Sequence, residues 1–456
     1  MTTYYVGITA AGNEDGTTWA DRLGTLNDAE NIPVAANDTV YVGPGTYRET
    51  LTVDVAGTAG NPITYIGDVD GSHTDGVGGI VRITGSNNDT TATRANCIIG
   101  AFAYRTFRGL SLDLGLANAL IYAKEDHWII EDCNLSHSAF GVYSEQTATT
   151  DIIIRRCNFF NLTTAAIKFW AGAQLAGTNH LIENCLFLGC DTGLLDTRVE
   201  GITIKDCTFI GSGYSCIDAP TTTAAAQITV NNCIFCANDK VFNAGADTTQ
   251  IVENYNALFG NNTARVNTNT GANSNAYPPL FNPATLLSGY RYPWNFPELA
   301  PYSPLRAIAG TGEATDDLFG RARPATAAKN SWGAVQFSDT LRETTTKRTG
   351  TASIKFEDAG RHQIWVPTTN VSTTISVYVY YEEDYAGTLP QMIIKQPGVA
   401  NRTTVATVAG KEDWELLTDT FTPAASPGYC VVELVSNNTA AYSATVQCMF
   451  DDLVVS

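Results

Sequence analysis

The chain has 456 residues, of which 44% are hydrophobic and only 16% are charged, and its net charge is −19 at pH 7. This composition excludes a disordered chain and a coiled coil, and the negative charge argues against nucleic acid and anionic membranes as partners. No apolar run reaches the roughly 18 residues that a membrane span needs. Residues 1–6 do not resemble a signal peptide, and the eleven cysteines are an odd number, so we expect folding in a cytoplasm unless a leader has been removed.

The N-terminal part, residues 1–35, begins with an apolar strand-like run and continues into an amphipathic pattern over 18–30. This pattern predicts a helix, which we expect to cap the open end of the structure that follows. Three short alternating runs then predict strands at 38–47, 62–67 and 80–85.

A repeat dominates the middle of the chain. Five segments share one template, at 128–135, 152–159, 180–187, 202–209 and 228–235, and each carries a cysteine at the same place. The cysteines Cys133, Cys157, Cys185, Cys207 and Cys233 are 24, 28, 22 and 26 residues apart, and an earlier copy at 105–112 has Leu110 in this column. Short alternating runs at this period, with no helical pattern between them, predict a parallel β-solenoid over residues 36–310.

The template also predicts which side chains face the core. The cysteine column should be buried and reduced, and two further apolar columns should point inward with it. One column is Phe107, Ile130, Ile154, Ile182, Ile204 and Val230, and the other is Leu112, Leu135, Phe159, Phe187, Phe209 and Phe235. An outward column alternates in charge from turn to turn, which favours stacking about 4.8 Å apart. It reads Arg108, Glu131, Arg155, Glu183, Lys205 and Asn231.

A second strand follows eight to ten residues after each cysteine. We expect its inward column to be Val142, Ile167, Leu194, Cys216 and Val241. The next residue in each strand should then face outward, namely Tyr143, Lys168, Leu195, Ile217 and Phe242. Four of these five are apolar or aromatic, so the strip is expected to be a subunit interface in a homotrimer, or to be covered by a loop such as 171–179.

Several motifs resemble a known family. Two segments near the N-terminus, Gly12–Gly16 and Asp38–Tyr47, resemble the start of right-handed parallel β-helix proteins related to pectate lyases and phage tailspikes. Two later segments resemble the end of the same fold, namely Asp317–Arg323 and Trp332–Val335. The resemblance covers roughly residues 1–335 and implies the fold. For activity it leaves lyases, hydrolases and non-catalytic adhesins and virion proteins open. Residues 311–339, rich in glycine, proline and alanine, are expected to be a linker or closing segment.

Residues 340–456 change to longer alternating runs, which predict an antiparallel β-sandwich. With Trp414 ahead of a strand and the closing run Phe450–Asp452, this part resembles a jelly roll of the carbohydrate-binding-module type. The resemblance implies sugar stacking on the aromatic residues Trp365, Tyr378, Tyr380 and Trp414, against the alternative that they are core or cross-strand pairs. Asp451 and Asp452 are candidates for a structural Ca²⁺ site, and no other cofactor or metal is expected.

The candidate catalytic residues are carboxylates with one arginine close by in sequence. Asp196 and Asp218 occupy equivalent positions in the expected columns, so neighbouring turns would bring them together, with Asp191 and Arg198 near by. Paired carboxylates suit glycoside hydrolysis, and an arginine beside carboxylates resembles a lyase site. The alternative, that these aspartates only make turn hydrogen bonds, is favoured, and no catalytic site is expected.

Three functions remain open. The leading hypothesis is a non-catalytic structural and adhesive protein of a bacteriophage virion, made in the host cytoplasm. It would decorate the tail or capsid, contact other virion proteins and attach to cell-surface polysaccharide. The alternatives are a polysaccharide lyase or glycoside hydrolase of the β-helix class, and a bacterial cell-surface adhesin that would be extracellular.

Overall fold

The computed structural model divides the chain into two compact units, one of Met1–Pro279 with Pro304–Gln336 and one of Leu280–Ser303 with Phe337–Ser456. The residues it describes are 1–32, 34–116, 119–145, 150–175, 178–220, 228–245, 248–279, 299, 305, 314–318, 323, 333–334, 342–343, 353–356, 360–367, 372–381, 385, 387–396, 399–407, 411–422, 429–438 and 448–455.

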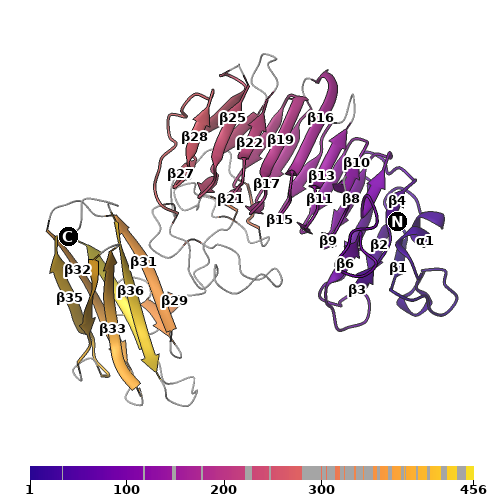
Figure 1. Cartoon of the computed structure of the whole chain (residues 1–456). Coiled ribbons are helices and arrows are strands. Elements are labelled where there is room, and N and C mark those ends of the chain that lie inside the picture. The colour runs from indigo at the N-terminus through magenta and orange to yellow at the C-terminus, as the bar shows by residue number, and fades with distance from the viewer. Residues whose placement is uncertain are drawn as a thin grey trace. The chain divides into compact units, whose positions relative to one another are not determined.

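The first unit is a parallel β-solenoid in which each turn contributes one strand to each of three sheets, so that equivalent strands stack along the coil (Figure 1). Sheet A consists of β1 (Thr3–Val6), β2 (Thr39–Val42), β5 (Ile63–Gly67), β8 (Arg105–Arg108), β11 (Trp128–Glu131), β14 (Ile153–Arg155), β17 (His180–Glu183), β20 (Ile202–Lys205), β23 (Ile228–Asn231) and β26 (Ile251–Asn254). Sheet B consists of β3 (Gly45–Tyr47), β6 (Val81–Thr84), β9 (Ser111–Asp113), β12 (Asn134–Ser136), β15 (Asn158–Phe160), β18 (Leu186–Leu188), β21 (Thr208–Ile210), β24 (Ile234–Cys236) and β27 (Ala257–Phe259). Sheet C consists of β4 (Leu51–Val53), β7 (Ile98–Gly100), β10 (Ala119–Ala123), β13 (Phe140–Glu145), β16 (Ala165–Leu175), β19 (Thr192–Val199), β22 (Ser215–Ala219), β25 (Lys240–Ala244) and β28 (Thr263–Val266).

The three inward columns predicted from the repeat are confirmed. All their members, including the five template cysteines, are at most 1% exposed and belong to one continuous core. The phenylalanines stack face to face along the coil, with ring centroids 4.2 Å apart for Phe187 and Phe209. A single turn cannot cover its own apolar side chains, so the core is buried by stacking each turn on its neighbours.

The alternating outward column of sheet A is also confirmed. Its members are register partners in adjacent strands. Arg155 Nε lies 2.6 Å from Glu131 Oε2, and Lys205 Nζ lies 3.2 Å from Glu183 Oε2. Opposite charges in neighbouring turns therefore favour this register over one that would place like charges opposite each other.

A single residue in the left-handed backbone region turns the chain from sheet A into sheet B. The residues at this corner are Gly109, Asp132, Arg156, Asn184, Asp206 and Asn232, with φ values of 52° to 68°. Glycine, asparagine and aspartate tolerate this conformation best. Arg156 is the exception, and ion pairs hold its side chain, with Nε 2.7 Å from Asp132 Oδ1 and Nη2 3.0 Å from Glu131 Oε2.

The helix expected over 18–30 is not a single helix. Trp19–Asp21 form a 3₁₀ turn, Leu23 makes a β-bridge to Val6, and only Leu26–Asn31 are α-helical (α1). The break follows from Thr25, whose side chain accepts a hydrogen bond from the N–H of Asp28 and so starts a new helix. Among the described residues, no helix is long and apolar enough to span a membrane.

Helix α1 carries a buried ion pair that the sequence did not suggest. Glu30 lies inside the solenoid, where its Oε2 is 2.6 Å from Nη2 of the fully buried Arg105 on β8. Tyr65 also donates a 2.5 Å hydrogen bond to Glu30 Oε1. These contacts join the helix to two strands of sheet A, and hydrogen bonds offset part of the cost of burying the charges.

A later segment of the chain is bonded to the corner between sheets A and B. Its described residues are 314–318, 323 and 333–334, and we call it the strap. Asp316 Oδ2 lies 2.9 Å from Arg156 Nη1, and Asp316 Oδ1 accepts from Asn184. The N–H groups of Ala314 and Gly333 donate to Asp206 Oδ2 and to the carbonyl of Asn232. The strap is therefore bonded to four successive turns.

The second unit contains two antiparallel sheets (Figure 1). One consists of β29 (Arg342–Glu343), β30 (Ser353–Phe356), β37 (Cys448–Val455), β32 (Thr373–Tyr381) and β35 (Glu415–Phe421), and the other of β31 (Gly360–Pro367), β36 (Tyr429–Asn438), β33 (Gly387–Gln396) and β34 (Val399–Val405). Residues of both sheets share one buried core. The predicted all-β architecture, a parallel solenoid followed by an antiparallel sandwich, is thereby confirmed.

Candidate functional site

The outward face of sheet C carries an unbroken ladder of side chains, one from each of eight successive strands. We call it the sheet C ladder, and its members are Ile99, Tyr122, Tyr143, Lys168, Leu195, Asp218, Asn243 and Val266. Parallel pairing fixes the backbone beneath each member, so these side chains project from a rigid surface at intervals of about 4.8 Å.

The first half of the ladder is a cluster of aromatic rings and lysines. The rings of Tyr122 and Tyr143 are parallel to within 7°, with centroids 5.1 Å apart. Lys168 Nζ lies 4.4 Å from the centroid of Tyr143, and Lys124 Nζ lies 4.6 Å from that of Tyr122. Ring faces attract ammonium groups, so the tyrosines hold the lysines against the sheet. Trp170, two residues beyond Lys168 on β16, is 36% exposed.

Glu145 supplies the negative charge of this cluster. Tyr122 donates a 2.5 Å hydrogen bond to Glu145 Oε2, and this bond is the main reason that the pKa of Glu145 lies below its ordinary value. Burial raises the pKa of Tyr122 and Tyr143 and lowers that of Lys168. At neutral pH the cluster therefore offers an ionised carboxylate and protonated tyrosine hydroxyls.

The second half of the ladder is polar. Asn243 donates a 2.7 Å hydrogen bond to Asp218 Oδ1 and a 3.4 Å one to the hydroxyl of Tyr214. Lys240 Nζ lies 4.0 Å from the centroid of the Tyr214 ring. Burial raises the pKa of Asp218, while the hydrogen bond from Asn243 and the charge of Lys240 act against this rise.

Two residues expected in the outward strip face the core instead. Ile217 and Phe242 are fully buried. The strand register pairs Ile217 with Leu194 of the inward column, and Phe242 with Ile217, so both residues continue that column. Within β22 and β25 two successive residues are buried, Cys216 with Ile217 and Val241 with Phe242, so counting by twos slipped by one residue. The strip is therefore not the predominantly apolar one that we expected, and Asp218 and Asn243 occupy the two outward positions.

The expected pair of carboxylates does not form. Asp218 aligns with Leu195 on the outward face, whereas Asp196 aligns with the buried Phe169 and is itself 1% exposed. The two carboxylates therefore lie on opposite faces of sheet C. Asp191 is exposed at the corner that precedes β19. The side chain of Arg198 lies outside the described residues.

Sequence reasoning missed four members of the aromatic–lysine cluster, namely Tyr122, Lys124, Glu145 and Trp170. Glu145 and Trp170 each stand two residues beyond a ladder residue, and strict alternation would have placed them on the same face. Tyr122 was hidden by spacing, because it follows Leu110 by 12 residues whereas Tyr143 follows Cys133 by 10. Only the strand pairing reveals that Tyr122 and Tyr143 are neighbours.

In the second unit, Tyr378 and Tyr380 lie on the outward side of β32, whose alternate residues Val377 and Val379 are buried. The ring centroids of Tyr380 and Trp414 are 5.6 Å apart. The side chains of Trp365, Asp451 and Asp452 lie outside the described residues. In the part of the chain that is described, no three His, Cys, Asp or Glu side chains are grouped so as to hold a metal ion.

Residues 79–277 match the family described as "right handed beta helix region". This part of the chain is a right-handed β-helix. A search of curated proteins finds no match.

Among solved structures, the chain is similar to pectate lyase Pel9A, with 13% identity and a TM-score of 0.47 over 74% of this chain and 97% of that one. It is also similar to the GH136 lacto-N-biosidase from Eubacterium ramulus (13% identity, TM-score 0.37, 60% and 57% of the chains). A third is the tailspike protein gp49 from Acinetobacter baumannii bacteriophage Fri1, a capsular polysaccharide depolymerase (11% identity, TM-score 0.32, 92% and 82%).

Proposed function

We propose that the protein binds polysaccharide along the sheet C ladder. The observation that carries this proposal is the aromatic–lysine cluster, in which an exposed indole stands on the same sheet face as an ionised carboxylate, a lysine and two tyrosine hydroxyls. Sugars present both C–H faces and hydroxyl groups, and they are recognised by amphipathic rings together with fixed hydrogen-bonding groups.

The form of the ladder favours a polymer over a small molecule. Polar or aromatic groups recur in most of its rungs, whereas a small ligand needs one enclosed pocket. The net charge of −19 disfavours nucleic acid, another long polymer. An extended glycan fits both constraints.

The test is binding of the full chain to an array of bacterial surface polysaccharides. We expect Trp170→Ala and Lys168→Met to reduce binding at least tenfold. Tyr277→Ala removes an aromatic ring that is 55% exposed and lies outside the ladder, so it is the matched control and should bind normally. Absence of polysaccharide binding by the wild type, or equal binding by all three variants, would refute the proposal.

We propose further that binding is not followed by cleavage. A lyase or hydrolase remains the second candidate, because Asp218 is a carboxyl group of raised pKa on the ligand-facing side of sheet C. Incubating each bound polysaccharide with the wild type and with Asp218→Asn separates the two. If the wild type depolymerises a polysaccharide and the variant does not, the proposal of binding without cleavage is wrong and the protein is an enzyme.

We also propose that the protein is a homotrimeric component of a virion. Support for the virion comes from the buried free thiols of the core, which suit folding in a reducing cytoplasm, combined with a surface suited to extracellular glycans. Sedimentation equilibrium should give three times the chain mass of 48.8 kDa. A monomer at micromolar concentration would exclude the trimer.

The second unit is proposed to bind sugar through Tyr378, Tyr380 and Trp414, with a Ca²⁺ ion near Asp451 and Asp452. The tilted contact between Tyr380 and Trp414 supports an aromatic platform. In the full chain, the double variant Trp414→Ala with Trp170→Ala should then bind polysaccharide more weakly than Trp170→Ala alone. Calcium should raise the melting temperature of the wild type, and calorimetry with and without EDTA measures this.

A further inference from the structure

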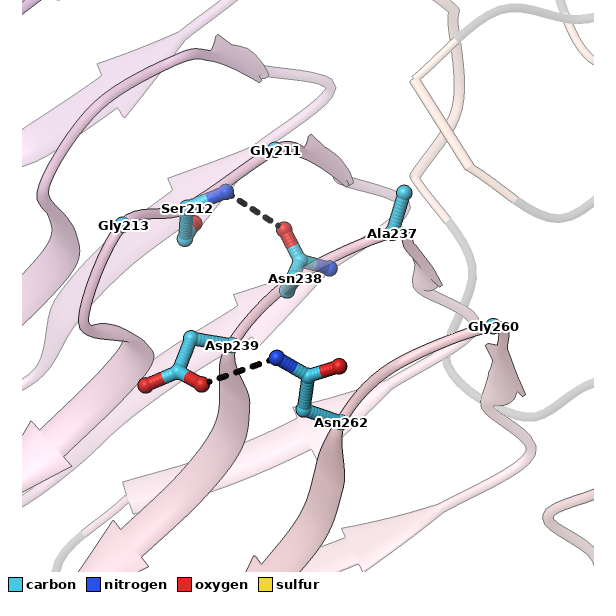
Figure 2. Close-up of a pocket in the computed structure, with 8 residues that line it drawn as sticks. All are labelled: Gly211, Ser212, Gly213, Ala237, Asn238, Asp239, Gly260 and Asn262. Atoms are coloured by element: carbon cyan, nitrogen blue, oxygen red, sulfur yellow. Dashed lines mark hydrogen bonds between the residues drawn. The ribbon is translucent and has the colours of Figure 1, made fainter.

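An open surface pocket of about 420 Å³, called the cavity below, lies at the corner where sheet B turns into sheet C (Figure 2). Three consecutive turns contribute to it, with Gly211 and Gly213 from one, Asp239 from the next and Gly260 and Asn262 from the third. Its size falls within the range of about 300–1,000 Å³ that is usual for ligand pockets.

Gly213 allows a close approach between neighbouring turns at this corner. A Cβ atom on Gly213 would come within 2.9 Å of Asp191 Oδ1. Asn238 fixes the wall behind it, since its Oδ1 accepts from the N–H of Ser212 at 2.9 Å and its Nδ2 donates to the carbonyl of Phe209 at 3.2 Å. The cavity is therefore a preformed feature of the backbone.

The lining chemistry is that of a site for neutral hydroxyl groups. Asp239 Oδ1 accepts a 3.1 Å hydrogen bond from Asn262 Nδ2, and both residues line the cavity (Figure 2). The carboxylate accepts from hydroxyl groups, while the amide both donates and accepts, which suits adjacent hydroxyls on one ring. Ala237 is the single apolar side chain among the lining residues, and none of them carries a positive charge. The lining therefore suits neither an apolar nor an anionic ligand.

The cavity adjoins the sheet C ladder. Tyr214 and Lys240 directly follow Gly213 and Asp239 in the chain, and they contact each other beside Asn243 of the ladder. A group bound in the cavity would thus sit next to the second half of the ladder, to one side of its line.

We propose that the cavity binds a neutral sugar branch of the polysaccharide whose main chain lies along the ladder. This inference rests on the proposed function, because a branch requires a main chain bound near by. It makes Asp239 and Asn262 specificity-determining residues that select branched over linear polymers.

The test uses methyl glycosides of glucose, galactose and mannose as probes of the full-length protein, with methyl glucuronide as the charged counterpart. We expect at least one neutral glycoside to shift the backbone amide resonances of Gly213 and Gly260, and the glucuronide to shift neither. Asp239→Ala should weaken this binding at least tenfold. Asn262→Ala, at an exposed position that folding tolerates, should do the same.

Asp191→Ala is the matched control, because Asp191 belongs to the same corner but does not line the cavity. No shift with any neutral glycoside, stronger binding of the glucuronide, or wild-type affinity in both Asp239→Ala and Asn262→Ala would overturn the inference. If those results accompany polysaccharide binding that still depends on Trp170 and Lys168, the proposed function stands and only the branch site falls. If the array shows no polysaccharide binding although a glycoside shifts Gly213, the proposed function falls, and the branch site falls with it because no main chain is bound near by.

Discussion

Replacing Asp196 by asparagine should change how the stability of the solenoid depends on pH. Asp196 is 1% exposed, and among the described residues its Oδ2 atom has no hydrogen-bonding partner while Oδ1 accepts a 3.2 Å bond from the N–H of Val199. Burial raises its pKa to about 8. Asparagine has the same shape but does not titrate, so it isolates this effect.

The sign and size follow from the two pKa values. An unfolded aspartate releases its proton near pH 4, whereas folded Asp196 keeps it up to about pH 8. This group therefore contributes most to the unfolding free energy of the wild type below about pH 4, and that contribution is lost as the pH rises toward 8. At about 1.4 kcal/mol per pH unit, the loss between about pH 5 and pH 7 is on the order of 3 kcal/mol.

The assay is urea denaturation of the wild type and Asp196→Asn at several values between pH 5 and pH 8, followed by circular dichroism. The difference in unfolding free energy, variant minus wild type, should rise steadily with pH. His180, whose pKa burial lowers to about 4, and Asp206, whose pKa burial raises to about 7, titrate in both proteins and cancel in the difference. Parallel pH profiles of the two proteins would refute the reasoning, and so would a difference that falls with pH.

Two further predictions concern the core. Burial raises the pKa of the Cys133 and Cys157 thiols, so they should resist thiol reagents in the native protein and react once it is denatured; a titration that finds the template cysteines oxidised would contradict this. Removing one partner of the buried pair, as in Glu30→Ala, should cost about 3–5 kcal/mol of unfolding free energy. The double variant Glu30→Leu with Arg105→Met should be less damaged than Glu30→Ala in the same denaturation experiment, and equal damage would mean that the charges are not what matters.

Most of the solenoid followed from the sequence because the repeat fixes its own register. The inward columns on either side of the cysteine column, such as those of Ile154 and Phe159 around Cys157, lie at fixed distances from one recurring corner, so alternation finds them. The sheet C strands lie beyond a second bend of variable length, and there alternation fails, as it did for Ile217 and Phe242.

The candidate site was only partly predictable, for a related reason. Tyr143, Lys168 and Leu195 were correctly placed outward, but their partners depend on pairing between turns. The contact between Glu30 and Arg105 joins residues 75 apart with no shared motif, and the Asp196–Asp218 pairing was lost through the same one-residue slip. Local patterns thus specify which face a side chain occupies, while long-range register decides which side chains meet.

The strap has a mechanical consequence. When a solenoid is pulled from its end, each turn contacts only its neighbours and can peel away singly. Here the bonds from Ala314, Asp316 and Gly333 reach the four turns that contain Arg156, Asn184, Asp206 and Asn232. Those turns must yield together under load, so extension of the molecule should show one large rupture in place of a staircase of small ones.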